Sequence, residues 1–378
     1  MRKRNQRKHE AQEKRNSWGR ILRGIIAHTV ITLLLVAVLA FAGVVMVCAL
    51  IFNGPSTTAR DVLTMSMLES SGMKWCPAVF IGEETVARIQ QNVSAKLPEE
   101  ISTPANVVIQ TGNALTGADA EWAEYPDGIR IESIRGETYT AHIMIVRDPS
   151  RVYLATSNPE FSLNIPGRRI DEVIETEKAA AGVNGGAFND DGTGAEYVGR
   201  KPVGITVSRG EIVWDDDRNA EGFAGFNQDN MLVVATKINE KQIAELNIRD
   251  GCCFGPVLIM NNMVNEEAYN ANSGYNPRTC IGQRADGAVI FLCIDGRQAN
   301  SLGGTYADAI DIMVEYGAVN ACNLDGGSSS IMYYRDTYGR YGEPGTLQMI
   351  NNYSLLQEQA RQMPTFFMIA SLEEGGQN

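Results

Sequence analysis

The sequence predicts an α+β fold, a mixed sheet with packed helices in one large extracytoplasmic domain that follows a single transmembrane helix. Three observations lead to this prediction. Residues 24–52 contain no Asp, Glu, Lys or Arg and are mostly aliphatic. From about residue 127, short apolar runs typical of strands are separated by glycine-rich turns. Helical segments fall between these runs without the strict alternation of a doubly wound sheet.

The first 52 residues predict a signal anchor in the cell membrane. Residues 1–23 form a basic tail, and residues 24–52, as a helix, are long enough to cross a hydrocarbon core of roughly 30 Å. This stretch exceeds the roughly 7–15 residues of a signal-peptide core, and no clear small-residue cleavage site closes it. Positive charge before the helix keeps that end in the cytoplasm. We therefore expect one helix in the lipid bilayer, a cytoplasmic N-terminus and an extracellular C-terminal domain.

The charge balance outside the tail argues against a nucleic-acid partner. The whole chain has 33 Lys and Arg against 45 Asp and Glu. Without the nine basic and two acidic residues of the tail, 24 remain against 43, a net charge of −19. Such an acidic domain repels polyanions. A nucleic-acid-binding role for the basic tail is the alternative, but its place beside a membrane span favours the cytoplasmic-tail interpretation.

Composition and periodicity divide the rest of the chain into two regions. Residues 53–126 are expected to be a partly helical membrane-proximal region and linker, with helical spacing in "ARDVLTMSMLESSG" and "GEETVARIQQN". Residues 127–373 are expected to be the catalytic domain. In it, helices are predicted at about 171–181, 238–246 and 305–317, the last with Thr305 and Asp308 as a capping box. Strand pairs are predicted around the turns "DPS", "RG" and "ADG".

Six cysteines follow the membrane span, an even number. In an oxidising compartment this predicts at least one disulfide, although spacing does not determine the pairing. The alternative is burial as small hydrophobic residues, because three of them lie in apolar strand-like runs. No CxxC pair is present, so a zinc site is not expected.

Several classes of chemistry are excluded by missing residues. His142 is the only histidine after the membrane span, and its place in "YTAHIMIV" is typical of a packed strand residue. The chain has no HExxH, no P-loop and no GxGxxG after a strand. The remaining chemistry is that of carboxylates, arginines, amides and backbone N–H groups.

Four segments combine these groups where strands end: "GVNGGAFNDDGTG", "NPRTCIG", "CIDGRQANSLGGT" and "NLDGGSSS". Taken singly, each could be a surface turn, and "NDDGTG" could be a calcium loop through Asp190 and Asp191. Arg278 and Arg297 lie next to strand ends in a domain of strongly negative charge. Guanidinium and backbone N–H groups complement phosphate or carboxylate oxygens, so these segments favour an anionic ligand.

Together these motifs resemble the phosphodiester glycosidase family over about residues 135–372. "VNGGAF", "PRTCIG", "IDGR" with its "GGT" before a helix, and "NLDGGSSS" occur in the family's order. The chain departs from the family pattern at Ala187, where an aromatic residue is usual, and at Ser328, which replaces a third glycine. The resemblance implies a hydrolase that acts on a sugar joined at its anomeric carbon to a phosphodiester, with a glycan or sugar-phosphodiester as partner.

Residue roles follow from this resemblance and from the chemistry. A carboxylate stabilises an oxocarbenium-like centre or activates water, and arginines neutralise the leaving phosphate. Which aspartate is the acid and which the base stays open. No cofactor and no metal are expected, with calcium at Asp190 and Asp191 as the alternative. The predicted site comprises catalytic Asp325 and Asp295, phosphate-binding Arg278 and Arg297, and the substrate contacts Asn184, Thr279, Gly326, Gly327 and Ser328.

Two other functions fit the same residues. One is a non-catalytic module that binds envelope glycans. The other is a metal-assisted phosphodiesterase that cuts the P–O bond with Asp190, Asp191 and Asp325 as ligands. The predicted membrane anchor favours substrates in cell-envelope or exopolysaccharide glycans.

Overall fold

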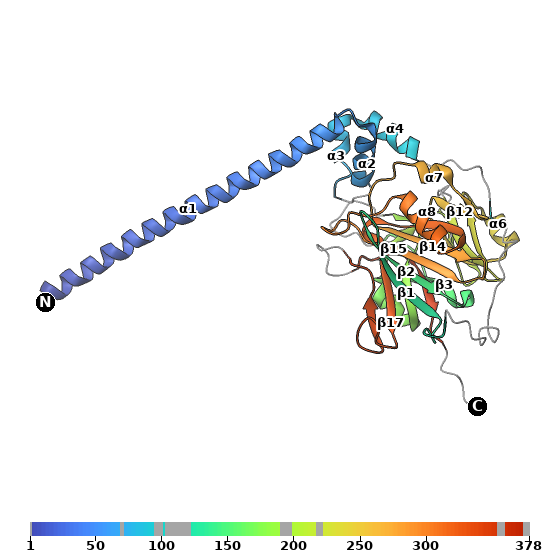
Figure 1. Cartoon of the computed structure of the whole chain (residues 1–378). Coiled ribbons are helices and arrows are strands. Elements are labelled where there is room, and N and C mark those ends of the chain that lie inside the picture. The colour runs from blue at the N-terminus through green and yellow to red at the C-terminus, as the bar shows by residue number, and fades with distance from the viewer. Residues whose placement is uncertain are drawn as a thin grey trace. The chain divides into compact units, whose positions relative to one another are not determined.

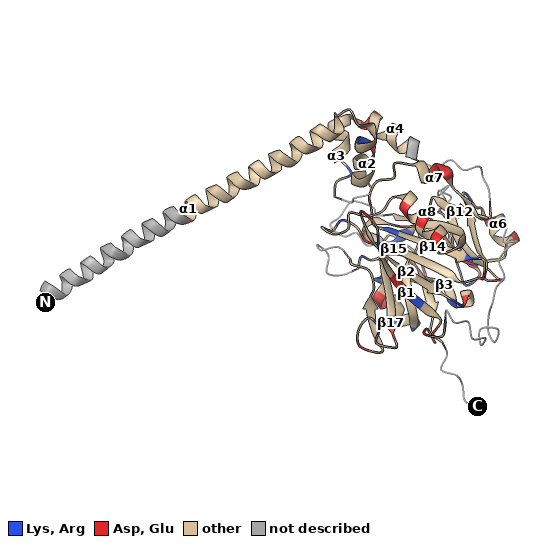
Figure 2. Ribbon diagram, viewed as in Figure 1, with Lys and Arg blue, Asp and Glu red and all other residues tan. Residues whose placement is uncertain are grey.

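The computed structural model describes residues 2–68, 72–93, 101–102, 122–189, 199–216, 222–353 and 360–372. The chain divides into two compact units, Met1–Arg60 and Asp61–Asn378. The first unit is dominated by helix α1, Arg2–Phe52 (Figure 1). Its segment His28–Phe52, with a mean hydropathy of 3.0, is long and apolar enough to cross a membrane. The segment His28–Phe52 contains no Lys, Arg, Asp or Glu, and Figure 2 shows this part of α1 in tan.

Three short helices follow α1, as the helical spacing of this region predicts. They are α2 Thr57–Leu68, α3 Cys76–Ile81 and α4 Glu83–Val93. Thr64 and Met67 of α2 are buried, and the Ser66 hydroxyl accepts a hydrogen bond of 3.0 Å from the backbone N–H of Tyr275. The part of α2 from Asp61 onward therefore belongs to the second unit. Most of the predicted linker between 93 and 126 lies outside the described residues.

Three larger sheets form the second unit, and the strand pairings described in them are all antiparallel. The seven-stranded sheet has the order β1-β2-β15-β14-β16-β12-β13. Its strands are β1 Ile129–Arg135, β2 Thr140–Val146, β12 Val257–Met260, β13 Met263–Val264, β14 Arg278–Arg284, β15 Val289–Ile294 and β16 Ala318–Leu324.

The other two sheets have five strands each. The order β18-β17-β4-β19-β3 joins β3 Val152–Thr156, β4 Ala179–Asn184, β17 Met332–Asp336, β18 Thr346–Met349 and β19 Thr365–Ala370. The order β10-β9-β11-β7-β8 joins β7 Thr206–Ser208, β8 Glu211–Trp214, β9 Phe223–Asn227, β10 Leu232–Ala235 and β11 Ile248–Cys253. A separate pair consists of β5 Phe188–Asn189 and β6 Lys201–Pro202.

One central core joins the three sheets, and helices cover their outer faces. Alternate residues of β15 show this arrangement. Phe291 and Cys293 contribute to the central core, whereas Leu292 and Ile294 pack in a second cluster with α8 Tyr306–Glu315. Helix α5 Ile170–Glu177 covers the β4 sheet, and α6 Glu240–Glu245 covers the β11 sheet. The short helix α7 Glu266–Asn270 adds Ala268 to the α8 cluster. Two 3-10 helices, Pro149–Arg151 and Gly327–Ser329, complete the fold.

The α+β prediction is confirmed, and the three predicted helices correspond to α5, α6 and α8. The turn "ADG" joins β14 and β15 in the expected hairpin, with Gly287 at a φ of 91°. The α+β class combines several sheets with packed helices, and the strand pairings described within these sheets are antiparallel. The segment "DPS" also differs, since its 3-10 turn leads the chain from β2 into β3 of another sheet.

The cysteines follow the alternative interpretation, because all seven are free thiols. Cys252, Cys293 and Cys322 belong to the central core, and Cys280 to the cluster under α8. Burial raises the pKa of Cys253 and of Cys280 to about 12, and that of the other three buried thiols well above its usual range. The expected disulfide is therefore not formed, and these residues fill apolar space.

We expect these five buried thiols to be unreactive in the folded chain at pH 8, because their raised pKa values leave almost no thiolate. Ellman's reagent should modify none of them until the protein is unfolded. After unfolding without a reductant, mass spectrometry should find all five alkylated. Fewer than five modified thiols in the unfolded chain would reveal a disulfide and contradict this assignment.

Candidate active site

The candidate site lies where β14 begins and its two neighbours end. In the ladders, Arg278 pairs with Ile294 of β15 and Thr279 pairs with Leu324 of β16. Asp295 and Asp325 are the next residues of these strands, so they flank the start of β14. With neighbouring strands about 5 Å apart, their backbones are separated by roughly 10 Å. Antiparallel pairing thus brings together three segments that are distant in sequence.

Asn184 connects the segments around Asp325. Its side chain is fully buried at the end of β4, and its Nδ2 donates to the Asp325 carbonyl at 2.6 Å. Its Oδ1 accepts from the Thr279 hydroxyl at 2.7 Å and from the Ile331 N–H at 3.2 Å. The Asp325 N–H donates to the Gly185 carbonyl at 3.2 Å. Asn184 and Thr279 therefore lie behind the Asp325 loop and hold it, and their predicted contact with substrate stays a prediction.

The two glycines after Asp325 allow the backbone to approach the start of β14. The Gly327 N–H donates to the Pro277 carbonyl at 2.9 Å, and Gly327 has a φ of 61°. A Cβ on Gly326 would lie 2.9 Å from that same carbonyl oxygen. A larger residue at either position would displace the loop. Gly326 and Gly327 thus position Asp325, which is itself half-buried, and Ser328 follows in the 3-10 turn.

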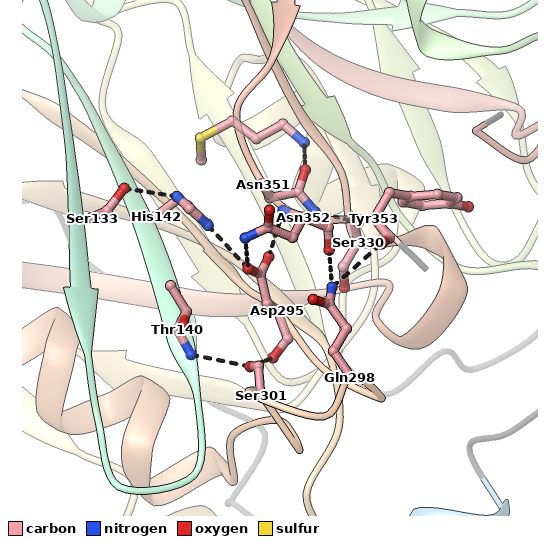
Figure 3. A network of polar contacts seen from close by, with 11 residues as sticks. Ser133, Thr140, His142, Asp295, Gln298, Ser301, Ser330, Asn351, Asn352 and Tyr353 are labelled. Atoms are coloured by element: carbon pink, nitrogen blue, oxygen red, sulfur yellow. Dashed lines mark hydrogen bonds and ion pairs between the residues drawn. The ribbon is translucent and has the colours of Figure 1, made fainter. Parts of the chain in front are cut away.

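Asp295 has a different environment, a buried network of polar contacts (Figure 3). Its side chain is only 1% exposed. One carboxylate oxygen accepts from the Asn352 N–H at 3.0 Å. The other accepts from Asn352 Nδ2 at 2.7 Å and lies 3.1 Å from His142 Nε2. Both oxygens are therefore engaged, and the carboxylate cannot turn toward a ligand without losing these bonds.

His142 is a site residue whose partner was not predicted from the sequence. It pairs with Cys293 in the ladder between β2 and β15, so its side chain lies on the same sheet face as Asp295. Its Nδ1 lies 2.8 Å from the Ser133 hydroxyl of β1. Since the carboxylate only accepts, Nε2 carries a proton, and in the neutral ring Nδ1 accepts from Ser133. Its interpretation as a packed strand residue missed this role, because the register of β2 on β15 is not visible in the sequence.

A short segment, Asn351–Tyr353, connects the Asp295 network to the loop after Asp325. Asn351 accepts from the Met332 N–H at 2.8 Å and donates to the Ser330 carbonyl at 3.2 Å. Asn352 binds Asp295, and the Tyr353 hydroxyl donates to the Ser328 carbonyl. Three consecutive side chains thus link Asp295 to the loop after Asp325. Figure 3 shows this segment beside Asp295 and Ser330. The sequence does not predict the role of this segment, because "NNY" resembles none of the four motifs described above.

The two predicted phosphate-binding arginines are placed differently. Arg278 is 2% exposed; its Nε donates to the Gly304 carbonyl at 3.1 Å, and one Nη donates to those of Ser273 and Gly274 at 2.8 and 3.2 Å. Its guanidinium also lies 4.3 Å from the centre of the Tyr306 ring. These bonds fix the segment before β14, and the phosphate role of Arg278 stays a prediction without a contact that supports it.

Arg297 is exposed and has a φ of 58°, in the left-handed region. Its guanidinium donates to the Asn276 side chain at 3.3 Å, next to Pro277. The structure thus keeps Arg297 near the start of β14 with an exposed side chain. Its role as a phosphate ligand also stays a prediction.

A third arginine was missed by sequence reasoning. Arg361 precedes β19, and one of its Nη groups lies 3.2 Å from the Ser328 hydroxyl and 3.5 Å from that of Ser329. Its guanidinium carbon lies 4.8 Å from the centre of the Phe188 ring. The signal was weak, since "ARQ" is a common surface pattern. Only the return of the chain to this loop shows where Arg361 belongs.

The calcium alternative falls on residues that the structure does not describe. Asp190 and Asp191 lie in the gap between 189 and 199. Among the residues that are described, no group of three or more His, Cys, Asp or Glu side chains could hold a metal ion. Asp295 donates nothing to such a site, because its oxygens accept hydrogen bonds from Asn352 and His142. Both the expectation of no metal and the calcium alternative at Asp190 and Asp191 therefore stay predictions.

Arg278→Lys is expected to lower the free energy of unfolding by about 2–3 kcal/mol. A lysine has its donors on a single nitrogen, whereas Arg278 binds the Gly304 and Ser273 carbonyls through two different nitrogens, so a buried acceptor is left unsatisfied. Urea unfolding of both proteins measures the difference. Arg297→Lys is the matched control, and its exposed side chain should change stability by less than about 0.5 kcal/mol. Equal effects of the two substitutions would contradict the buried role of Arg278.

The two aspartates should also differ in their effect on stability. Asp295→Asn places an amide donor against the donors of Asn352 and His142, and should cost about 1–3 kcal/mol of unfolding free energy. Asp325→Asn should leave the melting temperature nearly unchanged, because Asn184 and Gly185 hold its backbone and an amide of the same size replaces a half-buried carboxylate. Thermal melts followed by circular dichroism compare the variants. A melting temperature of Asp295→Asn that matches the wild type would show that the network contributes little.

The chain is similar to known proteins in both sequence and structure. The family model described as phosphodiester glycosidase matches residues 177–370. The SPbeta prophage-derived protein YomE of Bacillus subtilis (strain 168) is 25% identical over 193 residues, 48% of this chain and 27% of YomE. The chain thus spans about a quarter of that relative's length.

Solved structures with similarity to this chain include the following two. The catalytic domain of zebrafish N-acetylglucosamine-1-phosphodiester alpha-N-acetylglucosaminidase, auto-inhibited by its pro-peptide, has a TM-score of 0.52 and 19% identity. The match covers 73% of this chain and 89% of that one. An exported protein of Burkholderia pseudomallei K96243 has a TM-score of 0.42 and 16% identity, over 61% and 74% of the two chains. The matched family range includes Asn184, Asp295, Asp325 and Arg361, whereas His142 precedes it.

Proposed function

The chain belongs to the phosphodiester glycosidase family, and from this premise we propose that it is a hydrolase that cleaves the anomeric C–O bond of sugar 1-phosphodiesters. The observation that carries the proposal is that the family motifs lie together where β14 begins and β15 and β16 end in the seven-stranded sheet. Asn184, Thr279 and Asp325 are joined there by direct hydrogen bonds, and Asp295 follows the adjacent strand. This arrangement supports carboxylate chemistry at a single site.

In the proposed reaction the bond between C1 and the phosphate oxygen breaks, and its electron pair leaves with the phosphate monoester. A water oxygen bonds to C1 and passes a proton to a carboxylate, so the products are the free sugar and the phosphate monoester. A phosphate monoester is a good leaving group and needs less protonation than an alcohol. The reaction therefore requires one carboxylate near C1 and positive charge near the phosphate.

The environments of the two aspartates support a division of roles. Asp325 is half-buried, and hydrogen bonds to its backbone fix its position, which suits a catalytic carboxylate that stabilises positive charge at C1 or activates water. Asp295 is enclosed by Asn352 and His142, which suits a positioning residue. It holds Asn352, which is exposed, and through it the segment next to Ser328.

We also propose where the reaction takes place. The apolar segment His28–Phe52 and the basic tail before it support a membrane anchor with the N-terminus in the cytoplasm. The second unit then lies outside the cell, where glycans of the envelope or exopolysaccharides carry sugar-phosphate linkages. The acidic character of this unit is compatible with such substrates only if arginines offset the charge near the phosphate.

Hydrolysis in water labelled with heavy oxygen tests the reaction. With the methyl phosphodiester of N-acetylglucosamine 1-phosphate as substrate, we expect the label in the released sugar. Mass spectrometry of both products measures it, and Asp325→Asn should lower turnover at least about 100-fold. Label in the phosphate product would instead identify a phosphodiesterase that cuts the P–O bond. Binding without any released sugar would identify a glycan-binding module.

A further inference from the structure

Arg361 is the cation that lies directly on the loop after Asp325. Its Nη donates to the hydroxyls of Ser328 and Ser329, at 3.2 and 3.5 Å, and its guanidinium stacks on the Phe188 ring at 4.8 Å. Phe188 follows the Gly185–Gly186 motif, and the serines follow the Asp325 motif. Arg361 therefore contacts two of the loops that carry the family motifs, and stacking holds the plane of its guanidinium.

The Tyr353 phenol lies beside Arg361, and its pKa responds to the charges of Arg361 and Asp325. Burial raises the pKa of the Tyr353 phenol, the N–H and charge of Arg361 lower it, and the Asp325 carboxylate raises it further. The Tyr353 hydroxyl also accepts from the Arg361 N–H at 3.3 Å. The same hydroxyl donates to the Ser328 carbonyl, three residues after Asp325. Arg361 therefore lies beside the loop that Asp325 begins, next to hydroxyls that bind oxygen atoms.

This pair of charges matches the charge pattern of the proposed reaction. When the C1–O bond breaks, positive charge develops at C1 and negative charge on the phosphate, one bond apart. A carboxylate suits the first and a guanidinium suits the second, because a guanidinium forms paired hydrogen bonds to phosphate oxygens. The Ser330 hydroxyl, which is buried and has no partner among the described residues, adds another donor to the same loop.

The other two arginines fit this role less well. Arg278 would have to abandon buried carbonyls to reach a ligand, which costs the desolvation of each unsatisfied acceptor. Arg297 is exposed beside Asn276, and it has no contact with the serine loop among its described bonds. The Arg361 guanidinium, by contrast, contacts Ser328 and Ser329 of the Asp325 motif directly.

We infer that Arg361, with the hydroxyl of Ser328, binds the phosphate group of the substrate while Asp325 faces the anomeric carbon. The inference rests on the proposed function for the identity of the ligand. It assigns the selection of phosphodiesters over neutral glycosides to this residue.

Binding of two matched ligands tests the inference without requiring turnover. The probes are the methyl phosphodiester of N-acetylglucosamine 1-phosphate and methyl N-acetyl-α-glucosaminide, which lacks the phosphate. Calorimetry on the full chain in detergent, with Asp325→Asn to preserve the substrate, gives both dissociation constants. Arg361→Gln should weaken binding of the phosphodiester about 10- to 100-fold and of the neutral glycoside less than twofold. Arg361→Lys should show an intermediate loss, because it keeps the charge but not the fork.

Controls separate this inference from a structural role and from the proposed reaction. Arg209→Gln removes an exposed arginine whose described ion pair is with Glu177, outside the four motifs, and should change neither constant. A purely structural Arg361 would weaken both ligands equally and would lower the melting temperature, which overturns the inference. The inference also fails if the parent chain binds the phosphodiester no more tightly than the neutral glycoside. Failure of the proposed reaction appears separately, as absence of heavy oxygen in the sugar released by the wild type.

Discussion

The side chain of Asn184 makes the contact on which the candidate site depends. It is fully excluded from solvent, and its amide bonds to Asp325, Thr279 and Ile331. These residues come from three separate strand ends, and a buried amide that lost one partner would leave a polar group unsatisfied. The geometry of the Asp325 loop is therefore coupled to the ends of β4, β14 and β16. Gly326 and Gly327 also fix this loop, because they let its backbone reach the Pro277 carbonyl before β14.

The two aspartates illustrate how the same side chain acquires different properties. Both follow a buried strand, and both are neighbours of β14. Asp325 uses its backbone for attachment and leaves its side chain half-buried, whereas Asp295 uses its carboxylate to bind Asn352 and His142. Because both of its oxygens accept hydrogen bonds, the Asp295 carboxylate is fixed, and it holds the segment Asn351–Tyr353 through Asn352. A functional pair of carboxylates need not share the chemistry, because one can orient the elements that surround the other.

Arginines in this acidic domain are likewise sorted by their surroundings. Arg278 stabilises the segment before β14 through backbone carbonyls and the Tyr306 ring. Arg361 stacks on Phe188 and contacts hydroxyls, which are weaker partners than carboxylates. The described contacts of Arg361 thus place its guanidinium on the loop after Asp325. The position of such an arginine, rather than its presence, decides whether it stabilises the fold or binds a ligand.

The sequence by itself determined the apolar helix, the α+β class, the β14–β15 hairpin and the motifs that carry the family resemblance. These features are local, because apolar runs, turn residues and short motifs act within a few residues of each other. Only the tertiary structure decided that His142 meets Asp295, that Arg278 points into backbone carbonyls and that Arg361 returns to Ser328. The physical reason is that each contact joins residues far apart in the chain. The register of β2 on β15 places His142 on the face of Asp295. The paths of the loops around β14 and β19 bring Arg278 and Arg361 to their partners.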